Sequence, residues 1–162
     1  MPPRRPSTAE RAEIRRATPG DAPLVARLLH DFQREYDEPS PDLETLGERY
    51  AELNRSREMM VLLAGDGPDG FAQLRLRPWV YSPGLHAYLE ELYVVPGQRG
   101  RGLGRALLEA AMEQARGEGA THMELGTSET DQAARALYES AGFVNREGGP
   151  DGPVMLFYER EL

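Results

Sequence analysis

The stretch with the clearest chemical potential runs from Gln98 to Arg105 and reads Gln-Arg-Gly-Arg-Gly-Leu-Gly-Arg. It follows an apolar segment with the pattern of a strand and precedes a segment with the periodicity of a helix. Glycines let a backbone approach its ligand closely, and the first N–H groups of a helix have no partner inside that helix. The stretch therefore predicts a loop that binds a phosphate-bearing ligand.

Two common phosphate loops are excluded by the residues present. The dinucleotide fingerprint G-x-G-x-x-G fails because its third glycine position falls on Arg105 or on Leu107. The Walker loop needs a lysine, and all 19 basic residues of the chain are arginine. The same absence excludes a Schiff-base lysine, and the absence of cysteine excludes a thiol nucleophile, a disulfide framework and cysteine-ligated zinc.

Two adjacent acids, Glu90 and Glu91, interrupt the apolar segment 88–95. Acids in the middle of a strand need a reason, because burying a charge is costly. A carboxylate in this place can take a proton from an incoming ammonium group, although a surface-facing edge acid is the alternative for either residue. Successive side chains of a regular strand point to opposite faces, so only one of the two acids can serve a site unless a bulge intervenes.

Hydrophobic periodicity predicts the element order β-α-α-β-β-β-α-β-α-β-β and one α/β domain over residues 13–162. Residues 1–12 are expected to be a disordered leader. A parallel pair of strands should flank the crossover helix that follows Gly102. The expected helices are 22–36, 43–55, 103–116 and 131–140, the expected strands are 13–17, 59–64, 71–77, 88–95, 122–127, 143–145 and 154–158, and 79–84 is expected to be a loop.

Composition and charge limit the classes of molecule that the chain is expected to bind. No apolar run approaches the roughly 20 residues that span a bilayer, and no secretory signal is recognised, so we expect a cytoplasmic protein without a membrane partner. The net charge of −8 argues against nucleic acid, including binding through the arginines of 99–105. Residues 31–58 hold nine acids against four arginines, which predicts an anionic wall for a cationic partner or, alternatively, an ordinary solvated helix face.

Three motifs together resemble the GCN5-related N-acetyltransferase (GNAT) superfamily over residues 13–160. They are Leu-Tyr-Val-Val-Pro at 92–96, Arg99-x-x-Gly102-x-Gly104, and Asp131-x-x-Ala134-x-x-Leu137-Tyr138-x-x-x-Gly142-Phe143. The resemblance implies a mixed, mostly antiparallel central sheet that is splayed between its fourth and fifth strands, with helices on both faces. It also implies acetyl-CoA as the co-substrate and no metal.

The resemblance also implies where acetyl-CoA binds. The pyrophosphate would sit on the loop amides, the pantetheine would pair with the main chain at 92–94, and an N–H near Leu92 would polarise the thioester carbonyl. Asp131 stands where the family has Asn, so it either contacts the pantetheine or only caps a helix. The implied cofactor-binding residues are Leu92, Tyr93, Val94, Arg99, Gly100, Arg101, Gly102, Leu103, Gly104, Arg105 and Asp131.

The catalytic residues expected from the resemblance are Glu90, Glu91 and Tyr138. Tyr138 would protonate the departing thiolate, or alternatively its hydroxyl only fixes the cofactor. We favour Glu90 slightly as the base and Glu91 as a binder of positive charge. His86 could assist, although a lone histidine is more often solvent-facing, and His30 and His122 are expected to be structural, so we expect no metal site.

The function expected is direct transfer of an acetyl group, in a ternary complex, to a primary amine of a cationic small molecule, aminoglycoside-like or polyamine-like. The absence of cysteine favours direct transfer over an acyl-cysteine route. Tyr36, Trp79 and Tyr81 could stack on a sugar or a cation. The alternatives are a peptide or protein amine as acceptor, and a non-catalytic module that binds or senses CoA. A homodimer is expected from the family alone.

Overall fold

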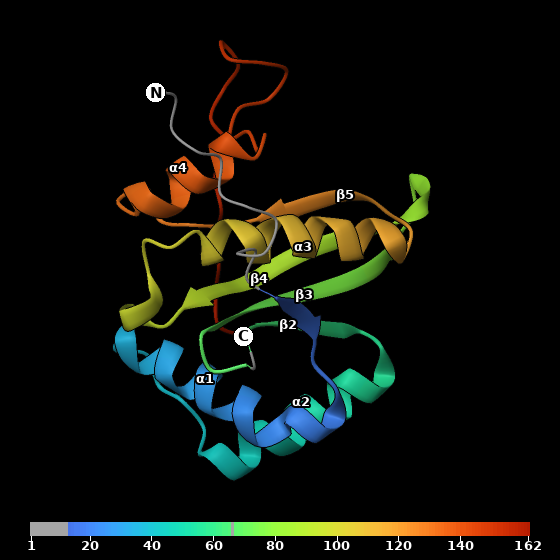
Figure 1. The fold of residues 1–162 in the computed structure, drawn as a ribbon. Helices are drawn as coiled ribbons and strands as arrows, with labels where there is room; N and C mark the ends of the chain where they lie inside the picture. Colours follow the sequence, from blue (N-terminus) through green and yellow to red (C-terminus); the bar gives the residue numbers. More distant parts are fainter. Residues whose placement is uncertain (1–12, 66) are drawn as a thin grey trace, which may run out of the picture. The chain divides into compact units, whose positions relative to one another are not determined.

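The computed structural model describes residues 13–65 and 67–162 (Figure 1), and the expected leader 1–12 lies outside them. The described residues form two compact units, one ending at Glu124 and the other spanning Leu125–Leu162. The strands are β1 (Ile14–Arg16), β2 (Met59–Ala64), β3 (Gly70–Trp79), β4 (Ser82–Val94) and β5 (Ala120–Leu125); the helices are α1 (Ala22–Glu35), α2 (Leu43–Ser56), α3 (Leu103–Gly117) and α4 (Gln132–Ser140). No described helix is both long and apolar enough to cross a membrane.

The sheet has the strand order β1-β2-β3-β4-β5. The first four strands pair antiparallel with their neighbours, and β5 returns parallel to β4 after the crossover through α3. Helices α1 and α2 lie on one face of this sheet and α3 lies on the other (Figure 1). The expected mixed, mostly antiparallel sheet with helices on both faces is confirmed.

The core follows from this layering, because each face of the sheet buries the apolar stripe of the helices above it. On the α1/α2 face, helix residues Val25, Leu28 and Tyr50 pack against Phe71 and Tyr93 of the strands. Tyr50 is almost fully buried, and its hydroxyl donates to the main-chain oxygen of Thr18 at 3.0 Å. Burial raises the pKa of Tyr50 to about 12, so this hydroxyl stays a donor.

An aspartate stands just before each of the first two helices, and only the second aspartate caps its helix with its side chain. Asp21, just before α1, accepts from both terminal nitrogens of Arg15 at 2.8 and 3.0 Å and from the N–H of Thr18 at 2.8 Å. These hydrogen bonds, with Arg15 contributing most, hold the pKa of Asp21 well below its usual range and link β1 to α1. Asp42 caps α2 by accepting from the N–H of Thr45 at 2.8 Å.

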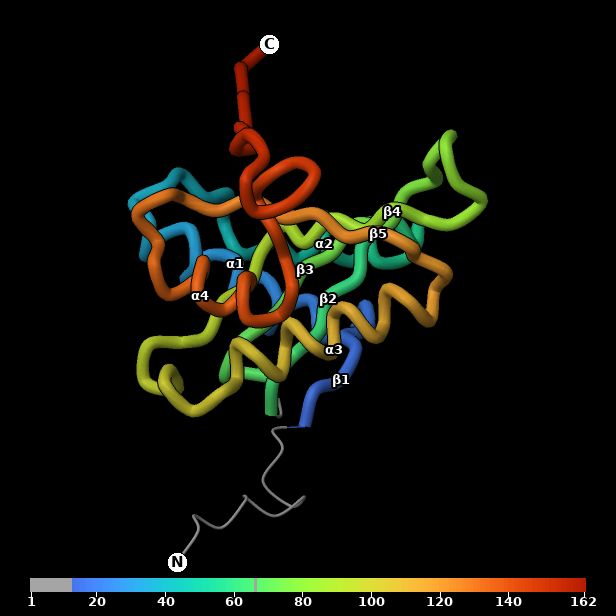
Figure 2. Tube along the Cα trace, turned by 90° about the horizontal axis from the view of Figure 1, so that it is seen from above, coloured from blue at the N-terminus to red at the C-terminus, as the bar shows by residue number. Residues whose placement is uncertain are grey.

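The expected loop at 79–84 is wrong, because β3 and β4 continue pairing up to Trp79 and Ser82. Only Val80 and Tyr81 are left for the turn, and they are strongly exposed. Strand β2 begins to pair with β3 only at Arg75, so the rest of the hairpin projects beyond β2 (Figure 2). The ring of Trp79 packs against that of His86 on the facing strand, so the pairing continues to the end of the hairpin despite the Pro and Gly content of the segment.

The strands expected at 143–145 and 154–158 are also wrong. The second unit forms α4 and then a single bridge between Arg146 and Val154, and among the described residues no strand follows Leu125. Two main-chain hydrogen bonds support the bridge, from Glu147 to Pro153 at 3.0 Å and from Met155 to Asn145 at 2.9 Å. The connecting residues 148–153 contain three glycines and two prolines, which limits the pairing to this short stretch.

The contact between β3 and β4 generates a stability prediction at Gly70. A Cβ added there would lie 2.5 Å from the carbonyl oxygen of Tyr93 and 3.2 Å from the Cα of Val94. Both atoms belong to the backbone of β4, so Gly70→Ala should lower the free energy of unfolding by about 1–3 kcal/mol. Gly117→Ala in α3 is the matched control, because its Cβ meets nothing within 4 Å. Denaturant titration should show a loss for Gly70→Ala alone, and equal effects at both sites would contradict the crowding.

Candidate active site

A β-bulge at Glu90 shapes the middle of β4. Glu91 pairs with Gln73 of β3, but the next pair is Leu89 with Leu74, so Glu90 is an extra residue without a cross-strand partner. In a bulge, two residues of one strand oppose one residue of its neighbour, and the strict alternation of faces is interrupted. The bulge that the two adjacent acids need in order to share one face is therefore present, and it is centred on Glu90.

The bulge places both acids on the α1/α2 face of the sheet. The carboxylate of Glu90 accepts from Nε2 of Gln73 at 2.5 Å and forms an ion pair with Nε of Arg75 at 2.7 Å. Gln73 and Arg75 follow Phe71 at period two, and Phe71 packs in the α1/α2 core. Glu91 lies directly across from Gln73 and shares its face.

The two acids have different surroundings. Glu90 is held and neutralised by Arg75 and Gln73, whereas Glu91 makes no hydrogen bond or ion pair with any described residue. Burial, and to a lesser extent the charge of Glu90, raises the pKa of Glu91 to about 7. A carboxyl group with this pKa can accept a proton near neutral pH and release it again.

Tyr88 extends this anionic surface along β4. It lies opposite Arg75 in the register, one step from the bulge on the same face. Burial raises the pKa of Tyr88, and so do the negative charges of Glu90, Glu124 and Glu91, in that order. The neighbourhood of the Tyr88 hydroxyl is therefore one that attracts a cation.

The glycine loop lies between β4 and α3 and leaves open space in front of its backbone. Gly100 and Gly102 have φ angles of +76° and +83°, a region that favours glycine. A Cβ on either residue would meet nothing within 4 Å. Gly102 is the N-cap of α3 and no side chain caps this helix, so its first N–H groups can receive an anion. The loop therefore leaves room for an anionic group beside its main-chain N–H groups.

The side chain of Arg99 does not lie among the loop amides but is committed to helix α1. Its Nη2 contacts both carboxylate oxygens of Glu35, at 2.6 and 2.8 Å. Its Nε donates to the carbonyl oxygen of Val94 at 2.9 Å, and its guanidinium lies 5.7 Å from the centre of the Tyr93 ring. Within the loop, Arg101 donates to Oε1 of Gln98 at 3.1 Å.

The last residues of β4 extend past the neighbouring strand. The N–H of Leu85 donates to the carbonyl oxygen of Gly119 at 3.0 Å, immediately before the six-residue strand β5 begins. Strand β4 continues nine residues beyond Leu85, to Val94. The main chain at 92–94, where the resemblance places the pantetheine, thus lies beyond the segment of β4 that β5 can accompany.

Leu103, Gly104 and Arg105 form the start of α3, whereas two other predicted residues, Asp131 and Tyr138, lie in the second unit. Asp131 caps α4 by accepting from the N–H of Ala134 at 3.0 Å, as the helix-cap alternative expects. Tyr138 lies on α4 with its ring 6.1 Å from that of Phe143, in an edge-to-face arrangement. Within this unit, the ring of Tyr138 therefore packs against Phe143, which follows α4 in the chain.

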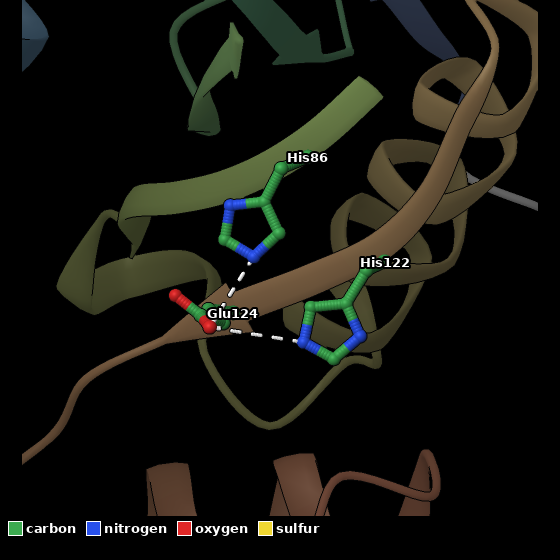
Figure 3. A group of neighbouring side chains, drawn as sticks. All are labelled: His86, His122 and Glu124. Atoms are coloured by element: carbon green, nitrogen blue, oxygen red, sulfur yellow. Dashed lines mark ion pairs between the residues drawn. The ribbon is translucent and has the colours of Figure 1, made fainter. Parts of the chain in front are cut away.

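The structure also gathers His86, His122 and Glu124, a group that sequence spacing did not bring together (Figure 3). His86 is buried, and its Nε2 lies 3.2 Å from Oε1 of Glu124, while Nε2 of His122 lies 3.7 Å from the same oxygen. The two imidazole rings stack on each other and lie beside the ring of Trp79. The only sequence signal was the alternation His-x-Glu at 122–124, which places both side chains on one face of a strand.

The protonation of His86 decides whether this group suits a metal ion. Nε of Arg77 donates to Nδ1 of His86 at 3.2 Å, so the neutral ring carries its proton on Nε2, the atom directed at Glu124. A metal bound at Nε2 needs that nitrogen deprotonated and an acceptor, not a donor, at Nδ1. The group therefore fits a hydrogen-bonded aromatic cluster better than a metal centre.

Comparison with known proteins places these features in a family. The sequence model of the acetyltransferase (GNAT) family matches residues 25–143. The chain is 34% identical over 139 residues to an aminoglycoside N(6')-acetyltransferase type 1 of Stenotrophomonas maltophilia, covering 83% of this chain and 87% of that protein. It is 41% identical over 94 residues to the enzyme of the same name from Klebsiella aerogenes, a match that covers 56% of this chain but only 61% of that relative.

A solved structure agrees with the sequence comparisons. A crystal structure of a protein from Arthrobacter sp. FB24 superposes with a TM-score of 0.87 at 44% identity, over 97% of this chain and all of that one. The bulged fourth strand, the open glycine loop and the match over residues 25–143 lead to one conclusion. The chain belongs to the acetyltransferase (GNAT) family.

Proposed function

We propose that the chain transfers an acetyl group from acetyl-CoA directly to a primary amine of a small cationic molecule. The observation that carries this proposal is Glu91, a half-buried acid without a partner and with a pKa of about 7, on the strand that leads into the glycine loop. The similarity to two enzymes named aminoglycoside N(6')-acetyltransferase supports an amine on an aminoglycoside-like acceptor.

The loop and the end of β4 would hold the donor. Acetyl-CoA supplies a thioester carbonyl, which is the electrophile of the reaction. The amides of the Gly100–Gly104 segment bind the diphosphate, and the main chain at 92–94 pairs with the pantetheine. The N–H near Leu92 then polarises the carbonyl, because a fixed donor stabilises the negative charge that develops there.

Glu91 would act as the general base. An amine acceptor arrives as an ammonium ion and must lose a proton before its nitrogen can attack. The sequence favours Glu90 for this role, but the contacts of Glu90 with Arg75 and Gln73 favour Glu91 instead. Glu90 stays paired with Arg75. Tyr138 gives its proton to the departing thiolate, the second proton lost by the acceptor nitrogen as the amide forms restores the tyrosine, and Glu91 releases its proton to the solvent.

The acceptor would meet an anionic surface with an aromatic border. The charges of Glu90, Glu91 and Glu124 all act at Tyr88, and opposite charge raises the local concentration of an ammonium ion. The ring of Trp79, which is 41% exposed, lies at the far end of the same hairpin, next to His86. An exposed indole can cover the apolar side of a sugar or a cation.

The proposal is tested by measuring thiol release from acetyl-CoA with a panel of aminoglycosides, polyamines and peptide amines. The rate with the preferred acceptor should rise with pH through about 7, because Glu91 must be deprotonated to act. Glu91→Gln should remove this dependence and lower kcat roughly 100-fold or more, whereas Glu90→Gln should keep the pH profile. Tight acetyl-CoA binding without thiol release for any amine would leave a CoA-binding module instead.

The raised pKa of Glu91 also has a consequence that does not depend on activity. In the unfolded chain this acid ionises near 4.5, but the folded protein retains the proton up to about 7. The native state should therefore lose stability relative to Glu91→Gln as pH rises between these values, by roughly 1–3 kcal/mol. Urea titration at several pH values measures this difference, and Glu52→Gln, an exposed acid of α2, should show no such trend.

The role of Tyr138 predicts a separation of chemistry from binding. Removing the hydroxyl in Tyr138→Phe should lower kcat about tenfold or more while the Kd for acetyl-CoA changes little, because the proton is needed only when the thiolate leaves. Tyr158→Phe, at an exposed tyrosine of the same unit, is the control and should leave both constants unchanged. An unchanged kcat in Tyr138→Phe would remove the acid role.

A further inference from the structure

We propose that Arg99 is a positioning residue that couples the glycine loop to the C-terminal end of α1, so that Glu35 sets the affinity of the loop for acetyl-CoA. This inference rests on the proposed function for the identity of the loop's ligand. It assigns Arg99 a role different from that of a phosphate ligand.

Three groups from two elements, α1 and β4, hold the guanidinium of Arg99. Both oxygens of Glu35 lie within 2.8 Å of its Nη2, its Nε donates to the carbonyl oxygen of Val94, and it faces the ring of Tyr93. Glu35 is the last residue of α1, and Val94 is the last residue of β4. Arg99 therefore joins the end of a helix, the end of a strand and the start of the loop.

The two loop glycines need such an anchor, because packing does little to restrict them. Glycine loses more conformational freedom than any other residue when it is ordered, and Gly100 and Gly102 both adopt positive φ. Neither Gly100 nor Gly102 would bring a Cβ within 4 Å of a neighbour, so packing does not fix them. Holding Arg99 at the start of the loop pre-orders the amides that follow and reduces the entropy that binding would otherwise cost.

At the other end of the Arg99–Glu35 contact, helix α1 packs against the ring of Tyr93. Glu35 influences Tyr93 directly, since burial and then the charge of Glu35 raise the pKa of Tyr93. Phe32, one turn earlier on α1, contacts the rings of Tyr93 and Tyr36. The Arg99–Glu35 contact thus connects the loop to α1, the helix that contains the first acids of the stretch 31–58. Coupling of this kind is reciprocal, so each end of the contact affects the other.

The two roles of Arg99 predict opposite effects for Glu35→Gln. If Glu35 anchors Arg99, the weakened contact loosens the loop and raises the Kd for acetyl-CoA, by about five- to tenfold. If Arg99 instead serves as a phosphate ligand, removal of the competing carboxylate frees it and lowers the Kd. The sign of the change therefore separates the anchor from the phosphate ligand without reference to catalysis.

The experiment measures acetyl-CoA binding by calorimetry for the wild type, Glu35→Gln and the control Glu113→Gln. Glu113 is an exposed acid of α3, so its substitution makes the same change in net charge but leaves the contact between Arg99 and Glu35 intact. We expect a raised Kd in Glu35→Gln alone. An unchanged or lowered Kd in that variant, when the wild type binds, overturns the inference and leaves the proposed function intact, whereas absence of binding in the wild type overturns both.

A double-mutant cycle with Arg99→Gln shows whether the two residues act through each other. The double variant should bind acetyl-CoA no more weakly than Arg99→Gln alone, and additive losses would contradict the coupling.

Arg99→Lys keeps the charge but loses the planar fork of the guanidinium, so it should rescue binding only in part. Thermal unfolding of each variant checks that it is folded. Hydrogen exchange should show that acetyl-CoA protects the end of α1 in the wild type but not in Glu35→Gln.

Discussion

The extra residue at Glu90 in the pairing of β3 with β4 is the constraint on which the candidate site depends. In a regular strand, Glu90 and Glu91 would point to opposite faces, and one of them would enter the layer beneath α3. The bulge brings both to the α1/α2 face, where Gln73 and Arg75 bind Glu90. Because those partners are used by Glu90, Glu91 is left without one, and its burial then raises its pKa to about 7. A single shift in register thus leaves one acid paired and the other without a hydrogen-bond or ion-pair partner among the described residues, with a raised pKa.

This arrangement could be predicted from the sequence only in part. The paired acids in an apolar strand and the Arg-x-x-Gly-x-Gly loop are local signals, and both fall where the motifs indicate. The position of the bulge is not local, because it is decided by which residues of β3 lie opposite Glu90. The distinction between Glu90 and Glu91 follows from Arg75 and Gln73, which are 15 and 17 residues away from Glu90 in the chain, so adjacent acids of the same type could not be told apart beforehand.

Helices were easier to predict than strand ends for a physical reason. The stripe through Val25 and Leu28 repeats within one helix and is set by its own geometry. Strand ends depend on pairing with a neighbouring strand: Trp79 extends β3 because Ser82 pairs with it. Residues 154–158 remain outside any strand although they form a continuous apolar run. The His86, His122 and Glu124 group shows the same dependence, since only the parallel pairing of β4 and β5 brings its members together.

Arg99 shows how a motif and its surroundings can point to different roles for one residue. An arginine at the start of an anion loop suggests a charge for the phosphate, yet its guanidinium is already neutralised by Glu35 and held by Val94. Under the proposed function, recognition of the diphosphate would fall mainly on main-chain N–H groups, whose positions the glycine conformations and the proposed anchor would set. Amides bind an anion without a full opposite charge, which would suit a ligand that must leave after every turnover. In such a loop, precise placement of the backbone contributes more than the number of arginines nearby.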